Sequence, residues 1–307
     1  MTTARIILSL LALCATGAAH AQFDIGLGGF IDTDAVNPTP PAEPSAPAAI
    51  VYNSNPKNYR YIDSVYELNQ KDARVTWTDD FAGYTQAGHK VFKVQAFRPE
   101  ATVTPEGKAV VSRGEVSAKW DYTKTGVRWY AISVFIPQDW HFNDLDMIIG
   151  QLHTSQKQAI VSPPVALSIQ GNYLKLSLHA SELTDIVSPD QSYLERLTSS
   201  EQSIRLAQID QPEARNKWYC FVMRVDWSPT PGVGAFKLWM NGKLKYQAEN
   251  AFNSYTTWLG NYPKTGLYVP ATTGMPDSQT IYTDYIYLAG AATTDPSELA
   301  SKTPCGS

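Results

Sequence analysis

Two short segments of the sequence combine side chains that can hold an anion and move a proton. Gln151 and His153 close an apolar run at a spacing of two residues, which on a β-strand places both on one face. An amide donor beside an imidazole can bind a carboxylate and exchange a proton at one carbon. Lys264 and Tyr268 also share a face if extended, and a nearby cation makes a phenolate more accessible for proton transfer.

The residues around Lys264 and Tyr268 suggest a rim that could receive a ligand. Tyr262 falls on the same face, and Pro263 indicates an edge or an irregular strand start. Gly266 lies between the ammonium and the phenol, so its missing side chain could leave a depression for a ring. An ordinary edge strand with a turn glycine would give the same pattern.

A third segment alternates charged and small or apolar residues. Arg113, Glu115, Ser117 and Lys119 fall on one face of the expected strand, and the residues between them fall on the other. A solvated outer face with cross-strand ion pairs produces the same alternation. The segment therefore becomes a candidate only together with the other two: Arg113 as a catalytic group, and Glu115 and Lys119 as substrate-binding groups.

The elements that must position these residues are β-strands. Alternation rich in aromatic and β-branched residues, interrupted by Gly, Pro and Asn, predicts strands at 91–97, 110–120, 127–136, 147–153, 165–169, 173–179, 218–227, 235–241, 266–269 and 281–288. Asn241-Gly242 predicts a hairpin, and helical signals are confined to 189–197 and the capping box at 295–298. This pattern predicts an all-β, concanavalin-like jelly-roll sandwich of two antiparallel sheets with few short helices.

The N-terminal part of the chain has the features of an exported protein. Residues 1–21 read as a signal peptide cleaved after Ala21, with a lipoprotein anchor at Cys14 as the competing interpretation. Residues 22–50 form a Pro- and Ala-rich linker, and 51–307 one folded domain. We therefore expect a secreted or periplasmic protein, with no membrane attachment after cleavage because no later stretch is long and apolar enough to span a bilayer.

The net charge restricts the class of binding partner, and the cysteine content allows a disulfide. After loss of residues 1–21 the chain has 24 basic and 29 acidic residues, a formal charge of −5, which argues against a nucleic-acid partner. An anionic polymer remains compatible if the basic residues gather in one groove. Cys220 and Cys305 can form a disulfide, or remain as a buried thiol and a loose one, and the sequence leaves both open.

Taken together, the three segments resemble the active-site strands of the alginate-lyase-type jelly-roll polysaccharide lyases. Those families share an Arg-x-Glu, a Gln-x-His and a Tyr-x-Lys-x-Gly-x-Tyr strand in this order, and the resemblance covers roughly residues 77–288. The surrounding sequence more closely resembles the glucuronan lyase and heparin lyase I branch, at Arg128-Trp129, Ile136-Pro137, Trp140, Trp218, Trp227 and Trp239-Met-Asn-Gly242. Alginate lyases commonly carry a second arginine where this chain has Ser117, which puts alginate in doubt as the preferred polymer.

The resemblance implies β-elimination on a uronate polymer, with a glucuronan-like substrate favoured and 4,5-unsaturated ends as product. Gln151, His153 and Arg113 would neutralise the uronate carboxylate so that the C5 proton becomes acidic. Tyr268, aided by Lys264, would take that proton and return one to O4 if both lie on one side of the ring. For an anti elimination, His153 would be the base and Tyr268 the acid. The single-tyrosine scheme is preferred.

Other functions fit the residues less well. A glycoside hydrolase needs a carboxylate pair, and the sequence has no Glu-x-Asp-x-x-Glu stretch. An alginate lyase of the same fold and a non-catalytic carbohydrate-binding jelly roll remain as alternatives. No motif for a nucleotide, haem or zinc occurs. A structural calcium ion at Asp144 and Asp146 would be the one candidate, and we expect no cofactor. The expected protein is a monomer that binds an anionic polysaccharide.

Overall fold

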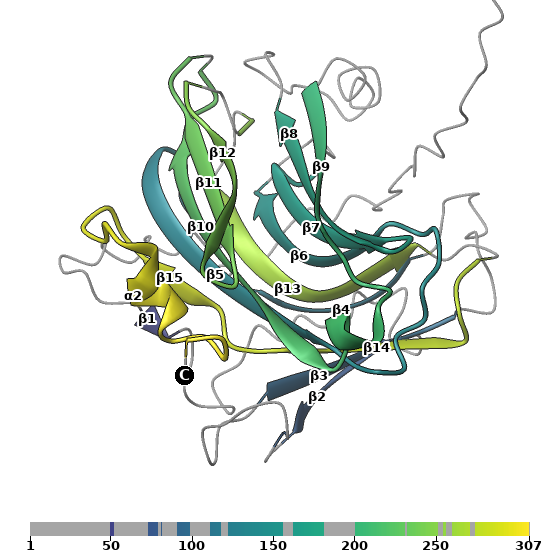
Figure 1. Ribbon diagram of the computed structural model, residues 1–307. Helices are drawn as coiled ribbons and strands as arrows, with labels where there is room; N and C mark the ends of the chain where they lie inside the picture. Colours follow the sequence, from purple (N-terminus) through teal and green to yellow (C-terminus); the bar gives the residue numbers. More distant parts are fainter. Residues whose placement is uncertain are drawn as a thin grey trace, which may run out of the picture.

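The computed structural model describes residues 50–51, 73–78, 81, 91–98, 111–117, 122–155, 162–180, 200–230, 232–250, 254–255, 260–270 and 274–306. Two antiparallel sheets are stacked into a β-sandwich, as predicted (Figure 1). The larger sheet contains β1 (Ile50–Val51), β2 (Ala73–Thr78), β3 (Val91–Phe97), β5 (Gly126–Ile136), β10 (Lys217–Trp227), β11 (Ala235–Met240), β12 (Lys243–Ala248), β14 (Ser278–Thr283) and β15 (Tyr287–Ala289).

The smaller sheet carries all three candidate segments. Its strands follow the spatial order β4 (Val111–Ser117), β13 (Asn261–Pro270), β6 (Met147–Thr154), β7 (Val165–Gln170), β8 (Tyr173–Ala180) and β9 (Ser200–Gln208). The helices of the described part are short: η3 (Pro212–Ala214) and α2 (Pro296–Ala300). None of them has the length and apolar character needed to cross a membrane.

Most predicted strands are confirmed, and one needs correction. The segment 281–288 is divided into β14 and β15, which pair with the same strand, β5. Thr283 is opposite Val134 and Tyr287 is opposite Ala131. The β14–β15 segment therefore has one residue more than β5 over this interval, and the chain leaves the β-ladder between Thr283 and Tyr287. The signal peptide, the linker except Ile50, the 189–197 helix and Lys119 lie outside the described residues.

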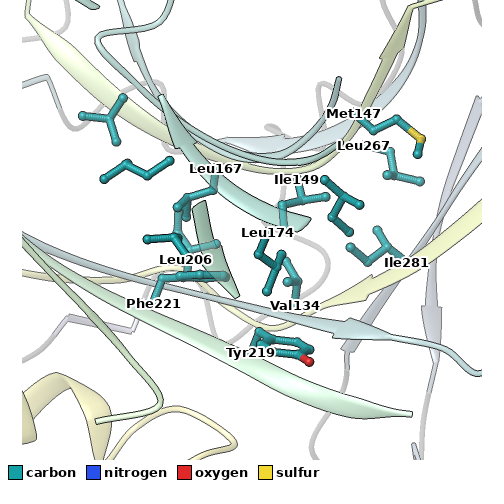
Figure 2. Close-up of a cluster of buried hydrophobic side chains, with 14 of the residues drawn as sticks. Val134, Met147, Ile149, Leu167, Leu174, Leu206, Tyr219, Phe221, Leu267 and Ile281 are labelled. Atoms are coloured by element: carbon teal, nitrogen blue, oxygen red, sulfur yellow. The ribbon is translucent and has the colours of Figure 1, made fainter. Parts of the chain in front are cut away.

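The core lies between the two sheets, and its composition follows from the alternation of side chains along each strand. Val134 and Phe221 of the larger sheet face Ile149, Leu167 and Leu174 of the smaller sheet (Figure 2). These side chains belong to one continuous apolar cluster, and its burial is the main stabilising contribution of such a sandwich. Because alternate residues of the smaller sheet face this core, the residues between them project from its opposite face.

A disulfide fixes the C-terminal segment to the larger sheet. Cys220 of β10 is bonded to Cys305, which follows α2, with a Cα–Cα distance of 6.1 Å. The pairing that the sequence left open is therefore present. It closes a loop across a sequence separation of 85 residues, so it restricts the unfolded chain substantially.

The double variant Cys220→Ala/Cys305→Ala is expected to lose about 2–4 kcal/mol of unfolding free energy, because the unfolded chain regains the freedom of the closed loop. Urea unfolding of the variant and of the wild type measures this difference. A reductant should lower the wild-type midpoint and leave that of the variant unchanged. Identical midpoints for the oxidised wild type and the variant would contradict the stabilising role.

Candidate active site

The three candidate segments form three adjacent strands, with β13 in the middle. Tyr268 is in register with Arg113 of β4, and Lys264 lies between Ser117 of β4 and Gln151 of β6. The residues that alternate with them, such as Val116, Leu152 and Leu267, belong to the core. The candidate residues therefore share the face of the smaller sheet that points away from the core. We call this face the polar face.

A chain of hydroxyl groups through the core anchors β13. Thr265 points inward, and its Oγ1 lies 3.2 Å from the carbonyl oxygen of Ile149 and 2.7 Å from Oγ1 of Thr283. Thr283 in turn donates to the carbonyl oxygen of Ser133 on β5, at 3.0 Å. Buried polar groups are expensive unless they are hydrogen-bonded, so this chain fixes β13 against the opposite sheet.

Glu115 is the centre of the polar face. One carboxylate oxygen, Oε1, accepts a hydrogen bond from Nε2 of Gln151, and the other, Oε2, lies 3.7 Å from Nζ of Lys264. All three side chains are at most 4% exposed. A carboxylate only accepts hydrogen bonds, so the contact orients the Gln151 amide with its nitrogen toward Glu115. Glu115 was expected only to bind substrate, whereas the structure gives it two internal partners.

The hydrogen bond between Glu115 of β4 and Gln151 of β6 connects these two strands across β13, at the position of Gly266. Gly266 is in register with Glu115 and has φ = 138°, a conformation that L residues rarely adopt. A Cβ built on it would lie 2.2 Å from the carbonyl oxygen of Gly114. The sequence interpretation of a depression for a sugar ring is therefore corrected, because the backbone of β4 fills the position of that Cβ.

Gly266→Ala is expected to reduce the unfolding free energy by more than about 1 kcal/mol, because alanine is strained at positive φ and its methyl group would collide with backbone. Chemical unfolding measures the effect. Gly242→Ala serves as the matched control, since Gly242 has φ = 74° and no atom within 4 Å of its Cβ position, so it isolates the strain of positive φ. Equal losses at both sites would show that the close approach of β4 adds nothing.

One end of the polar face is formed by Tyr268 and Arg113. The guanidinium carbon Cζ of Arg113 lies 5.5 Å from the centroid of the Tyr268 ring, and both residues are buried. A guanidinium group is always charged in proteins and stabilises negative charge nearby. Lys264 was expected to be the cation that assists Tyr268, and the structure adds Arg113 in direct contact with the ring.

The other end is formed by His153 and Tyr262, which are in register and whose ring centroids lie 5.5 Å apart. His153 is half-buried, and its Nδ1 lies 2.7 Å from the carbonyl oxygen of Thr154. Because a carbonyl oxygen can only accept a hydrogen bond, this contact assigns a proton to Nδ1. Nζ of Lys264 lies 5.6 Å from the Tyr262 centroid, and Tyr122, which sequence reasoning did not single out, packs on the same ring at 5.2 Å.

His153 and Tyr268 lie on the same face but not at the same point. His153 is opposite Tyr262, so six residues of β13 separate it from the row of Tyr268. Because β6 spans the same interval in five residues, this is about 16–20 Å of backbone at the usual rise per residue. The space around and between the two ends is occupied by Arg113, Glu115, Gln151, Lys264 and Tyr262. The site is thus an extended polar face with two ends, and Lys119 lies outside the described residues.

Asp144 and Asp146, the two residues considered for calcium, have different surroundings. Asp146 lies 3.4 Å from Nζ of Lys175, which gives its carboxylate a protein cation as partner, and Asp144 is exposed. In the part of the chain that the structure describes, no three His, Cys, Asp or Glu side chains lie together as metal ligands would.

Comparison with known proteins identifies the family. The family model described as "Polysaccharide lyase" matches residues 64–287. A solved endo-β-1,4-glucuronan lyase from the fungus Trichoderma reesei is similar in fold, with a TM-score of 0.60 and 17% identity over 76% of this chain and 93% of that one. The binding domain of botulinum neurotoxin serotype D/C is also similar, with a TM-score of 0.42 and 15% identity over 74% of this chain and 46% of that one. No curated protein matches the chain.

The family match spans well over half of the chain and includes the three strands of the polar face. A polysaccharide lyase breaks a carbon–oxygen bond of its polymer by elimination, which requires carboxylate recognition and proton transfer. The amide, cations and phenols of the polar face are groups of that kind. The chain belongs to the polysaccharide lyase family.

Proposed function

We propose that the protein is an exported lyase that cleaves a glucuronan-like, uronate-containing polysaccharide by β-elimination and leaves 4,5-unsaturated ends. The observation that carries this proposal is the polar face, where Glu115 holds Gln151 and Lys264 between Arg113–Tyr268 and His153–Tyr262. Such a face offers an acidic sugar both charge neutralisation and a proton-transfer group.

Neutralisation of the uronate carboxylate is the first requirement, because the C5 proton is otherwise too weakly acidic to be removed. Arg113 is the cation next to Tyr268, and its planar donor group suits a carboxylate. Gln151 contributes an amide that donates one N–H to Glu115, and we assign its second N–H to the substrate carboxylate. We therefore assign carboxylate binding to Arg113 and Gln151, with Lys264 compensating the buried charge of Glu115.

Tyr268 is assigned both proton transfers. Its phenolate takes the C5 proton, the electron pair of that C–H bond forms the C4=C5 double bond, and the C4–O4 bond breaks. The departing O4 then receives the proton from the same phenol, which restores the phenolate. The separation of about 16–20 Å of backbone between the rows of His153 and Tyr268 supports this scheme over one in which both act on one sugar ring. His153 is assigned to substrate binding.

Two observations favour a glucuronan-like polymer over alginate. Ser117, buried and in register with Lys264, occupies the position where alginate lyases commonly carry a second arginine. A solved protein of similar fold is named as an endo-β-1,4-glucuronan lyase. A polymer with C5–H and O4 on the same side of the ring is also what a single-tyrosine elimination requires.

The deciding experiment is an absorbance screen of the purified protein against glucuronan, alginate, heparin-type and hyaluronan-type polymers. The double bond of the product absorbs in the ultraviolet, so the polymer with the fastest increase identifies the substrate. The proposal expects glucuronan to give the largest signal. A signal from alginate alone would overturn the substrate assignment, and no signal from any uronate polymer would overturn the uronate proposal.

Gln151→Ala is expected to slow cleavage of the uronate polymer by about 10²–10³-fold, the usual cost of losing one donor to a developing charge. Initial rates of absorbance increase measure the loss. Gln247→Ala removes the same group from an exposed position of β12 in the other sheet and should leave the rate unchanged. Equal rates for the two variants would remove Gln151 from carboxylate recognition.

A further inference from the structure

The polar face continues beyond the candidate active site to the far edge of the smaller sheet. The register aligns one residue from every strand with Tyr268: Arg113, Tyr268, Ile148, Ser168, Lys175 and Arg205, from β4 to β9. With strands about 4.8 Å apart, Arg205 is about 20 Å from Tyr268 along this row. The row therefore leads from the proton-transfer group to two cations on β8 and β9.

The side chains of this row lie on the polar face because their neighbours along each strand lie in the core. Residues in the core or packed against it flank Ser168 on β7, Lys175 on β8 and Arg205 on β9, namely Leu167, Ile169, Leu174, Leu176, Ile204 and Leu206. The alternation of strand side chains then directs Ser168, Lys175 and Arg205 to the opposite side. The two cations thus share one face with Gln151 and Tyr268.

The two cations differ in how strongly the protein already neutralises them. Lys175 is mostly buried, and its Nζ lies 2.5 Å from Oε1 of Gln170 and 3.4 Å from Oδ2 of Asp146. Arg205 is exposed, and its guanidinium carbon lies 4.3 Å from the centroid of the Tyr173 ring. Stacking on an aromatic ring limits the conformations of the guanidinium while its N–H groups remain available at the edges. Arg205 therefore supplies the accessible charge.

A buried hydroxyl group gives an independent sign of a ligand in the same row. Ser168 is 1% exposed, and its Oγ has no hydrogen-bond partner among the residues that the structure describes. It lies in register between Ile148 and Lys175. Buried polar atoms are rarely left without a partner in native proteins, so this hydroxyl is suited to a polar group of a bound molecule.

We propose that Lys175 and Arg205, with Ser168, form a distal subsite that binds an acidic sugar of the polymer away from the bond that is cleaved. The inference rests on the proposed function for the identity of the ligand, an anionic polysaccharide. Arg205 pairs with the carboxylate of the distant sugar, and Lys175 adds a partly compensated charge beside it. The substrate chain accordingly extends from β13 across β6, β7 and β8 to β9.

Arg205→Ala tests the subsite by separating binding from chemistry. We expect KM for polymeric glucuronan to rise about three- to tenfold while kcat stays unchanged, because the subsite holds substrate without touching the reacting atoms. Arg205→Lys should give a smaller rise, and Arg205→Glu a larger one. The wild-type KM should increase with sodium chloride more steeply than that of Arg205→Ala, because screening acts on the charge that the variant lacks.

The matched control is Lys245→Ala, which removes an exposed cation from β12 in the other sheet and should change nothing. Melting curves followed by circular dichroism confirm that each variant is folded. Affinity gel electrophoresis with glucuronan measures binding independently of cleavage. If Arg205→Ala and Lys245→Ala bind and cleave alike, the subsite is refuted even though the lyase activity stands. If the wild type cleaves no uronate polymer, the proposed function fails, and the binding comparison alone decides the subsite.

Discussion

Replacing Tyr268 by phenylalanine is expected to reduce turnover of the uronate polymer by about 10²–10⁴-fold, the range for loss of a positioned proton-transfer group. The substitution removes only the hydroxyl group and keeps the ring that lies 5.5 Å from the guanidinium carbon of Arg113. Folding should therefore be retained, and KM should change less than kcat. Initial rates of absorbance increase, together with a melting curve, measure both properties.

The matched control is Tyr262→Phe, the same chemical change on the same strand and face. Tyr262 is 6% exposed and Tyr268 is 5% exposed, so the two substitutions disturb similar surroundings. Because Tyr262 lies beside His153, at the other end of the polar face, its variant should lose much less activity. A larger loss in Tyr262→Phe than in Tyr268→Phe would move the proton-transfer centre to the His153 end and overturn the assignment.

Lys264→Met is expected to lower the unfolding free energy by about 3–5 kcal/mol, because it leaves the buried carboxylate of Glu115 without its cation. Both side chains are at most 4% exposed, so water cannot replace the lost partner without rearrangement of the face. Urea unfolding of the variant and the wild type gives the difference. Most of the lyase activity should be lost as well, since Glu115 also orients Gln151.

The double variant Glu115→Gln/Lys264→Met distinguishes two causes of lost stability: the uncompensated buried charge of Glu115 and the lost packing of the Lys264 side chain. Removing both charges should recover a large part of the stability that Lys264→Met alone loses, since a neutral pair avoids the uncompensated burial. The two substitutions are in contact and should therefore be strongly non-additive. Additive losses would mean that the 3.7 Å pair contributes little, and that Lys264 acts through its packing.

The sequence was sufficient to predict which residues share a face. A spacing of two residues determines the side of a strand on which a residue lies, so Gln151 and His153, and Lys264 and Tyr268, could be paired without a structure. The aromatic and β-branched alternation likewise predicted the sandwich and most strands of its core. These features depend on local periodicity alone.

The sequence was not sufficient to predict how the strands align. Register places His153 opposite Tyr262 rather than near Tyr268, and the register of β13 with β6 shifts between Thr265 and Tyr268, where Gly266 adopts positive φ. Such irregularities depend on contacts between distant segments rather than on the local pattern. The central role of Glu115 depends on the same alignment.

The strands that the sequence did not predict are β1, β2, β9 and β12. β9 and β12 lie at the edges of their sheets, and β12 is exposed along most of its length. In β9 the alternation is limited to Ile204-Arg205-Leu206, after a polar first half, and in β12 it is short and directly follows the predicted hairpin. The far edge of the polar face, where Arg205 lies on β9, therefore could not be predicted from the sequence.

The central position of β13 has a consequence for when the enzyme can become active. β13 separates β4 from β6, yet its Thr265 is 116 residues later in the chain than Ile149 of β6, to which it is bonded. A growing polypeptide that already contains β4 and β6 has no strand to join them, and contacts between such distant segments form slowly. Ribosome-bound chains that end before residue 261 should therefore be catalytically inactive, and activity should appear only after β13 has been synthesised and inserted between β4 and β6.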